Sequence, residues 1–378
     1  MSTEWKFTDC KDKPLLIFSC LNWGLGHTTR SVPLINELLV SGCDLIVACN
    51  STQKVLLQAE FIDLKYVELP GYDLSYGSGR WATRLKIIAQ ISKILMRIKS
   101  ENAWLKAFIR ENKVDGLISD NRYGLYHPQI PSVFITHQLH VHSGYGSYAD
   151  SIIQKFLYRF INRFTVCWVP DFKKRNSLAG LLSHPETLPD IPVQYLGALS
   201  RFNECTGSTE KKFDLLILIS GPEPQRTILE KMMIEQSERS DKKIAIVRGL
   251  PGDTTILEHK KVSIFNHLNG NKLNKLICES ELVICRSGYT TIMDMVKLKK
   301  KMIVVPTPGQ SEQEYLAGYL SQNHFALSIP QNAFTLDRAL ELAANFSFTY
   351  IDTDMNEYKA VIKEFVQQIN SLSPSSTR

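Results

Sequence analysis

The sequence predicts an α/β protein of two doubly wound domains with parallel sheets, and three observations support this. Its 378 residues exceed what one hydrophobic core usually serves. Short apolar runs alternate with helical patterns through both halves of the chain. A polar run, FNECTGSTEKK at 202–212, separates the halves and is typical of a linker. We therefore expect one domain over residues 1–201 and a second over residues 213–378.

The apolar runs indicate where the strands lie. In the first half they occupy residues 15–20, 45–49, 116–120, 132–136 and 165–170. In the second half they occupy residues 214–220, 243–249, 261–266, 281–287 and 301–306. Runs that are apolar throughout are typical of parallel strands covered by helices on both faces. An amphipathic stretch at about 356–371 predicts a final helix.

The composition indicates a soluble, globular, cytoplasmic protein. Hydrophobic residues make up 44% and charged residues 22% of the chain. No apolar run approaches membrane-spanning length, and the N-terminus lacks the apolar segment of a secretory signal. The eight cysteines show no CxxC spacing, and Cys20, Cys49 and Cys285 end strand-like runs, so we expect free thiols and no structural disulfide. The net charge of +6 permits an anionic partner, and we expect no nucleic acid.

The stretch from Cys285 to Leu320 carries the strongest functional signal. It predicts strand, glycine turn, helix, strand, proline-bounded loop and helix. Each turn lies where a parallel strand ends and a helix begins, which is the usual ligand crevice of open α/β sheets, and free amides at a helix start favour a diphosphate. Asp294 is placed to accept hydrogen bonds from ribose hydroxyls, and Gln313 and Glu314 are placed to hold a sugar. The alternative is an ordinary βαβ unit with incidental polar residues.

A second motif, NWGLGHTTR at 22–30, follows the first apolar run directly. Gly24 and Gly26 allow a tight loop that a ligand can approach closely, and the following helix offers amides to an anion. A dinucleotide-binding turn is disfavoured because the third glycine of GxGxxG is missing. No acidic residue follows at the usual ribose distance unless Asp44 is counted.

Together these segments resemble the donor site of GT-B-fold glycosyltransferases, in particular the family 28-like enzymes that make lipid II and plant galactolipids. In that family an R-S-G turn leads into a helix whose acid binds the ribose of UDP, and Gln residues after a proline-bounded loop bind the sugar. The matching residues are Arg286, Ser287, Gly288, Asp294 and Gln313. Two residues depart from the pattern: Asp294 is shorter than the usual Glu, and Glu314 replaces a second Gln.

The resemblance implies a GT-B fold, in which two Rossmann-like domains face a cleft and the last helix crosses back to the first domain. It also implies further donor contacts at Gly26, at Arg201 and at the loop of Gly221. Arg201 is equally well interpreted as a solvated linker residue, and two prolines near Gly221 leave that loop fewer amides. Phe265 and Asn266 occupy the region that holds uracil in the relatives, and the alternative for Phe265 is a position in the core.

On the acceptor side, the resemblance assigns contacts to His137 and Gln138. His140 and His142 follow closely, but their spacing with His137 fits no common structural zinc site and lacks a cysteine. We therefore expect no metal. A polar acceptor pocket is the favoured interpretation.

The implied reaction moves a hexose or N-acetylhexosamine from a UDP-sugar to an acceptor hydroxyl, with inversion and without a metal or other cofactor. The departing diphosphate needs positive charge, which the helix start at Gly288 supplies with help from Arg201 and Arg286. A general base must take the acceptor proton. His27 is favoured because histidine titrates near neutrality, and Asp120, which ends a predicted strand, orients or replaces it.

Two segments at 79–99 and 151–164 are basic and aromatic, which predicts contact with anionic lipid at the inner face of the cell membrane and a glycan or lipid-linked acceptor. The alternative is a packed helix with a cationic outer face. Two other functions stay open: a nucleotide-sugar hydrolase, whose relatives in sugar-acid biosynthesis share a similar GxGH-R loop, and a non-catalytic sugar-nucleotide-binding subunit.

Overall fold

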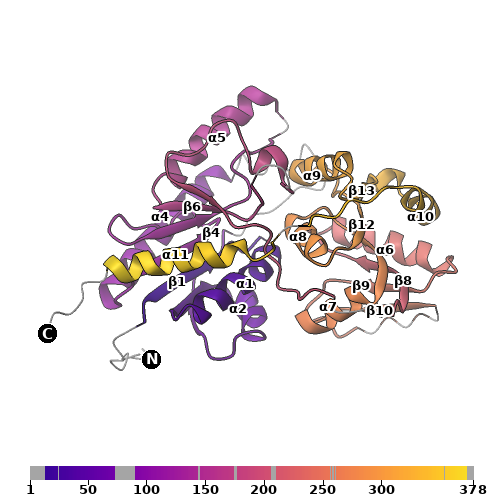
Figure 1. Ribbon diagram of the computed structural model, residues 1–378, viewed down its shortest axis with the longest axis horizontal. Coiled ribbons are helices and arrows are strands. Elements are labelled where there is room, and N and C mark those ends of the chain that lie inside the picture. Colours follow the sequence, from indigo (N-terminus) through magenta and orange to yellow (C-terminus); the bar gives the residue numbers. More distant parts are fainter. Residues whose placement is uncertain are drawn as a thin grey trace.

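Two parallel sheets, one in each half of the chain, form the two domains of the computed structural model (Figure 1). The structure describes residues 13–23, 25–72, 90–143, 145–173, 177–205, 210–255, 257, 259, 261–352 and 354–372. The first sheet has the order β3-β2-β1-β4-β5-β6-β7, and the second has the order β10-β9-β8-β11-β12-β13. The predicted two-domain α/β architecture is confirmed.

The first domain surrounds its sheet with helices. Its strands are β1 (Leu15–Cys20), β2 (Asp44–Cys49), β3 (Lys65–Glu68), β4 (Gly116–Asp120), β5 (Ser132–Ile135), β6 (Val166–Val169) and β7 (Val193–Tyr195). Its helices are α1 (Gly26–Val40), α2 (Ser51–Gln58), α4 (Ile91–Glu111) and α5 (Ser147–Ile161), with a 3₁₀ turn at Gly180–Leu182. Strands β3 and β7 were not predicted. Both are short edge strands without fully buried residues, so they lack the continuous apolar run of a central strand.

The second domain repeats this plan. Its strands are β8 (Phe213–Leu218), β9 (Ile244–Val247), β10 (Val262–Phe265), β11 (Ser280–Cys285), β12 (Lys301–Val304) and β13 (Leu327–Ser328). Its helices are α6 (Gln225–Glu238), α7 (Gly270–Cys278), α8 (Tyr289–Lys297), α9 (Ser311–Gln322) and α10 (Leu336–Ala344), with a 3₁₀ turn at Gln331–Ala333. Every predicted strand of this half is present, and only the short edge strand β13 was missed.

The last helix, α11 (Glu357–Leu372), returns from the second domain to the first, as predicted, and lies along it (Figure 1, yellow). Its buried face follows helical spacing at Ile362, Phe365, Val366 and Ile369. The ring of Phe365 lies 5.4 Å from that of Trp168 on β6. At Gly116 a Cβ would approach Ile369 to 2.8 Å, so the absence of a side chain there lets the helix pack closely.

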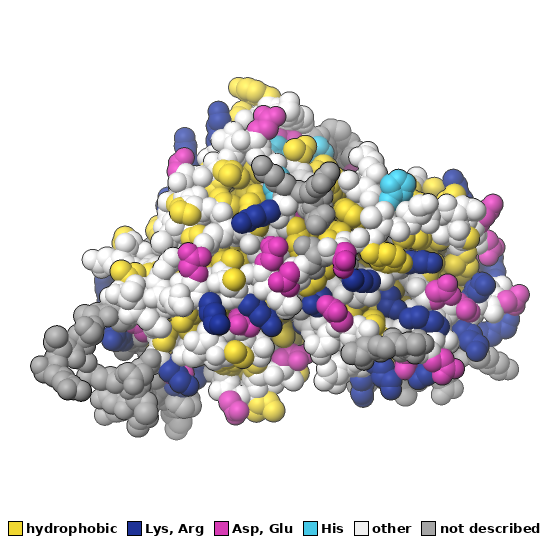
Figure 2. All heavy atoms as spheres, viewed as in Figure 1, with side chains coloured by type: hydrophobic (Ala, Val, Ile, Leu, Met, Phe, Trp, Pro, Cys, Tyr) yellow, Lys and Arg dark blue, Asp and Glu magenta, His cyan; other side chains and the backbone are white. Residues whose placement is uncertain are grey.

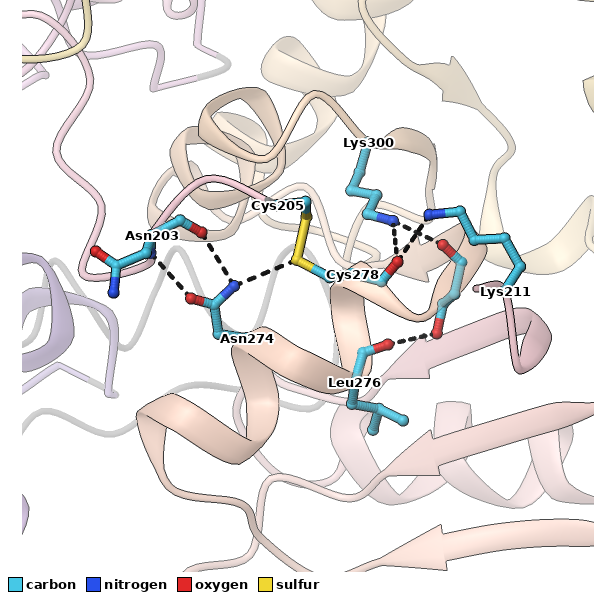
Figure 3. The surroundings of a disulfide bond; sticks show 8 residues. Asn203, Cys205, Lys211, Asn274, Leu276, Cys278 and Lys300 are labelled. Atoms are coloured by element: carbon cyan, nitrogen blue, oxygen red, sulfur yellow. Dashed lines mark hydrogen bonds between the residues drawn. A yellow bond between two sulfur atoms is a disulfide. The ribbon is translucent and has the colours of Figure 1, made fainter. Parts of the chain in front are cut away.

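One prediction is wrong: Cys205 of the linker and Cys278 at the end of α7 form a disulfide (Figure 3). They are 73 residues apart in sequence and belong to no recognisable spacing motif. They meet because the linker folds against α7, where Asn203 and Asn274 exchange hydrogen bonds of 2.9 and 3.1 Å. Among the cysteines that the structure describes, the free ones are all buried: Cys20, Cys43, Cys49, Cys167 and Cys285.

Some predictions concern residues that are not described. Gly24 lies outside the described residues, as do residues 79–89 of the predicted basic segment. In the part of the chain that the structure describes, none of the helices combines the length and apolarity needed to traverse a bilayer.

Candidate active site

Two helix N-termini meet where the domains join. The Thr290 hydroxyl on α8 donates to the carbonyl of Gly26 on α1 at 3.2 Å, and a Cβ on Gly26 would lie 3.0 Å from Thr290 Oγ1. Neither helix has a side-chain cap or an acidic residue in its first turn. The first amides of both helices therefore remain available, and their dipoles favour an anion at this junction.

Gly288 stands at the start of α8 and leaves room in front of it. Its backbone has φ −73°, which any residue adopts, and a Cβ built there meets no atom within 4 Å. Glycine is thus not required here for folding. The missing side chain instead keeps the approach to the α8 amides open.

A buried charged cluster lies behind the start of α1. Nδ1 of His27 is 3.1 Å from Oδ1 of Asp120 and 2.9 Å from Nη2 of Arg30. The Arg30 guanidinium donates to both Asp120 oxygens, from Nε at 2.7 Å and also from Nη2. Asp120 ends β4, a central strand, and is fully buried, whereas the His27 side chain is 15% exposed. The two predicted catalytic residues are therefore in contact, and Arg30 fixes the orientation of the carboxylate.

The charges of this cluster set the protonation of His27. Burial lowers the pKa of the His27 imidazole, Arg30 lowers it further, and Asp120 only partly offsets both. Burial alone would raise the pKa of Asp120, but Arg30 and His27 hold it below its usual range. At neutral pH the cluster therefore contains a neutral imidazole beside an ionised carboxylate. This is the state that a general base and its orienting acid need.

The cluster continues into the second domain through His137. Arg30 Nη1 donates to Nδ1 of His137 at 3.3 Å, and Nε2 of His137 bonds to Glu312 on α9 at 2.8 Å. The His137 ring stacks on Tyr289 of α8, with ring centres 4.2 Å apart and planes 4° from parallel. Gln138 also hydrogen-bonds to Glu312. The predicted acceptor residues are thus part of a polar connection between the domains.

Arg286 and Ser287, which directly precede Gly288, are buried and hydrogen-bonded to neighbouring loops. Arg286 is 1% exposed, and burial lowers the pKa of its guanidinium to about 10. It donates to three backbone carbonyls, those of Gln225, Val305 and Pro306. The Ser287 hydroxyl donates to the carbonyl of Gln313 at 2.8 Å. Both residues therefore hold the surrounding loops in place, and their contact with a donor stays a prediction.

Gln313 and Glu314 hold the proline-bounded loop. Oε1 of Gln313 accepts from the Thr307 amide at 2.9 Å, and its Nε2 donates to Gln310 at 2.6 Å. Glu314 accepts from the Gly309 amide at 3.0 Å. The two residues predicted to hold a sugar therefore also fix the backbone of the loop that precedes α9.

Asp294 lies at the junction with the linker. The Ser200 hydroxyl donates to its carboxyl at 2.6 Å. Burial raises the pKa of Asp294 to about 7, although Ser200 and Arg201 act in the opposite direction. Arg201 stacks over Phe202, and its Nη1 lies 3.9 Å from Glu60. Ser200 and Arg201 also line a cavity of about 350 Å³ between the domains.

The residues predicted to hold the nucleobase lie farther along the second sheet. Phe265 ends β10, the outermost strand, which β9 and β8 separate from β11. The Asn266 side chain accepts from Arg248 at 2.7 Å and donates to the carbonyls of Asp253 and Thr255. Gly221, after β8, has φ 107°, a conformation that favours glycine.

Three residues of the site were not predicted as site residues: Arg30, Tyr289 and Glu312. Arg30 follows His27 by one helical turn, so the spacing places both on one face of α1. No sequence signal places Glu312 opposite His137, because that contact depends on how the domains sit together.

Comparison with known proteins bears on the second domain and on the whole fold. Residues 226–369 match the glycosyltransferase family 28 C-terminal domain. A segment of 73 residues is 41% identical to the UDP-N-acetylglucosamine–N-acetylmuramyl-(pentapeptide) pyrophosphoryl-undecaprenol N-acetylglucosamine transferase of Methylorubrum extorquens. It covers 18% of this chain and 20% of that protein, so the similarity spans about a fifth of the relative's length.

Two solved structures cover nearly the whole chain. MurG of Acinetobacter baumannii has a TM-score of 0.51 and 14% identity, over 96% of this chain and 99% of that chain. The spinosyn rhamnosyltransferase SpnG complexed with thymidine diphosphate has a TM-score of 0.58 and 14% identity, over 95% and 96% of the two chains. At this identity the likeness shows the fold, and the predicted GT-B fold is confirmed. The chain therefore has the GT-B fold, and residues 226–369 of its second domain are similar to the glycosyltransferase family 28 C-terminal domain.

Proposed function

We propose that this protein is a glycosyltransferase that moves a hexose or N-acetylhexosamine from a UDP-sugar to an acceptor hydroxyl. The observation that carries the proposal is the meeting of two uncapped helix N-termini, at Gly26 and Gly288, beside the His27–Asp120 pair. The first feature suits a diphosphate and the second suits proton abstraction. The name of the matched family supports a glycosyltransferase, and the name of the Methylorubrum relative supports a UDP-sugar as donor.

In the proposed complex the diphosphate lies at the α8 start, in the space in front of Gly288. The ribose hydroxyls donate to the Asp294 carboxylate, and Arg201 adds positive charge nearby. The helix dipoles stabilise the charge that develops on the departing diphosphate, which is the role that a divalent ion has in other enzymes. The donor chemistry therefore proceeds without a metal.

The transfer is a single displacement at the anomeric carbon. The mechanism requires the His27 proton on Nδ1, where Asp120 accepts it, so Arg30 Nη2 donates to Asp120 and not to Nδ1. Nε2 of His27 then accepts the proton of the acceptor hydroxyl. The acceptor oxygen forms a bond to the anomeric carbon while the bond from that carbon to the diphosphate oxygen breaks. The electron pair of the broken bond leaves with UDP. Attack from the face opposite UDP inverts the anomeric configuration. Asp120 then stabilises the imidazolium that has formed.

The surface of α5 suggests where an acceptor arrives. Tyr148, Ile152 and Phe156 follow helical spacing and are 81%, 53% and 40% exposed, and Lys155 and Arg159 lie exposed between and beyond them. Hydrophobic and basic side chains are visible near the top of Figure 2, where Figure 1 places α5. An apolar and basic face of this kind suits an anionic lipid surface and a lipid-linked acceptor.

The test is turnover with UDP-glucose, UDP-galactose and UDP-N-acetylglucosamine, each with and without a polyprenyl-diphosphate-linked sugar in detergent. Mass spectrometry should show the acceptor gaining one sugar while UDP accumulates in equal amount. Release of free sugar at the same rate without acceptor would establish a hydrolase instead. Binding of UDP without turnover on any donor would indicate a non-catalytic subunit.

A further inference from the structure

Three side chains of the first domain, in and near the loop between β5 and α5, bring possible metal-ligand atoms close together. His140 and His142 belong to the loop between β5 and α5, and Asp150 lies in the first turn of α5. Nε2 of His140 and Nδ1 of His142 are 3.9 and 3.5 Å from Oδ2 of Asp150. One possible ligand atom from each residue lies within 4.8 Å of those of the other two. These separations exceed ordinary hydrogen bonds of about 3 Å, so the imidazoles surround the carboxylate oxygen without bonding to it directly.

Such separations suit atoms that share a metal ion. Zinc binds imidazole nitrogen and carboxylate oxygen at about 2.0–2.2 Å in a tetrahedron, which places neighbouring ligand atoms about 3.3 Å apart. The observed distances are somewhat longer, so the ligands need only contract around an ion. Two imidazoles with one carboxylate favour zinc over magnesium and calcium, which prefer ligand sets made of oxygen alone.

The Asp150 carboxylate is already oriented for this role. Its Oδ1 accepts from the Ser143 amide at 2.8 Å and also from the Ser143 hydroxyl, which leaves Oδ2 turned toward the histidines. Partners of this kind orient metal ligands in known metal sites. Asp150 is only 3% exposed, and a buried carboxylate is costly unless compensating charge or hydrogen bonds surround it.

The site is open to solvent on one side. The side chain of His142 is 46% exposed and that of His140 is 25% exposed, so an ion reaches Oδ2 from the histidine side. Three protein ligands leave the remaining tetrahedral position for water or for an oxygen of another molecule. The loop also contacts the second domain, because the Ser311 hydroxyl on α9 donates to the carbonyl of His142 at 2.6 Å.

We propose that His140 Nε2, His142 Nδ1 and Asp150 Oδ2 form a zinc site with one open position. This set replaces the one rejected from sequence, in which His137 was the third histidine. His137 is instead bonded to Arg30 and Glu312. Bound zinc joins the loop after β5 to α5 and restrains the segment that contains His137. The zinc ion does not contact the donor diphosphate, so the test of the zinc site is independent of the test of the proposed transfer.

The test is binding of zinc alone to the full chain after removal of metals with a chelator, measured by competition with a chromophoric zinc indicator. One equivalent should bind, with magnesium failing to compete. The variants His142→Ala and Asp150→Asn should each weaken binding about tenfold or more, while His127→Ala, a histidine outside the site, should leave it unchanged. Cobalt in place of zinc should give the visible absorption of a four-coordinate ion.

The Asp150→Asn variant keeps the shape of the side chain and an acceptor for Ser143, so it tests the ligand without removing that contact. Circular dichroism before titration confirms that each variant is folded. The proposal is overturned if the unmodified chain binds no zinc below micromolar concentration. It is equally overturned if folded His142→Ala and Asp150→Asn bind zinc as tightly as the unmodified chain, since the ion would then occupy another site.

Discussion

Nδ1 of His27 lies 3.1 Å from Oδ1 of Asp120, so the first turn of α1 and the end of the central strand β4 present a histidine oriented by a buried carboxylate. The two residues are 93 positions apart in sequence. Arg30 fixes the same carboxylate from one turn farther along α1. In the proposed mechanism this pair serves as a general base and its orienting acid, and Nε2 of His27 receives the acceptor proton.

Replacing His27 with alanine should slow transfer by about 100- to 10,000-fold, because a positioned general base contributes about that much. The affinity for UDP should be nearly unchanged, since His27 acts on the acceptor. Steady-state turnover and calorimetric UDP titration measure the two effects separately. Near wild-type turnover in this variant would remove His27 from the role of base.

The pH dependence gives a second check on the same pair. The pKa of His27 is lowered from its ordinary value, so turnover should hold constant above about pH 6.5 and decline only at lower pH, as the imidazole becomes protonated. Asp120→Asn removes a charge that raises the pKa of His27. The decline should therefore move to still lower pH while the plateau rate falls. A shift to higher pH would contradict this arrangement.

Asp294 should make ribose recognition depend on pH. Its pKa is raised to about 7 by burial, so the carboxylate that accepts from ribose hydroxyls forms as pH rises through that value. The ratio of UDP affinity to 2′-deoxy-UDP affinity should increase between pH 6 and pH 8. Both ligands carry the same diphosphate, so protonation of the phosphates affects both affinities equally and does not change the ratio. In Asp294→Asn the ratio should not vary with pH. An equally pH-dependent ratio in that variant would assign the effect elsewhere.

The raised pKa of Asp294 also affects stability, and the sign follows from proton linkage. The folded state retains a proton that the unfolded state loses near pH 4, so the free energy of unfolding should decrease as pH rises from about 4 to about 7. Above that window the folded state contains a buried charge. Asp294→Asn should therefore be more stable than the unmodified chain at pH 8 in urea unfolding, with the difference shrinking toward pH 4.

How much of the fold and of the candidate site is predictable from sequence depends on how far apart in the chain the contacting residues lie. Central strands such as β1 and β11 are mostly apolar and buried, so the local pattern sufficed to predict them. The contact between His137 and Glu312 depends on the docking of two domains, and no local pattern encodes it. Arg286 illustrates the same limit, because its hydrogen bonds to the carbonyls of Gln225, Val305 and Pro306 join segments that lie far apart in the sequence.

The α5 surface should bind anionic membranes. Phe156→Glu replaces an exposed apolar side chain by a charge and should reduce cosedimentation with vesicles that contain phosphatidylglycerol. Val55→Glu on α2 is the matched control, because Val55 is 69% exposed on another helix of the same domain. Equal loss in both variants would attribute the effect to net charge, and no loss in either would remove α5 as a membrane surface.

The disulfide should stabilise the oxidised protein. Closing a loop of 73 residues contributes about 4 kcal/mol through the unfolded chain. Reductant should therefore lower the free energy of unfolding of the unmodified chain. It should have no such effect on Cys205→Ser, and Cys43→Ser should respond to reductant as the unmodified chain does. A chain whose urea midpoint ignores reductant would contradict the pairing.

The most direct test of the donor site is calorimetric titration of UDP, GDP, CDP and ADP into the unmodified chain, Gly288→Ala and Gly318→Ala, all in EDTA. Both glycines have room for a methyl group, so both variants should fold, but only the Gly288 methyl enters the space in front of α8. The account predicts selective UDP binding without metal by the unmodified chain and Gly318→Ala, and its loss in Gly288→Ala. Undiminished UDP binding by Gly288→Ala would contradict the account.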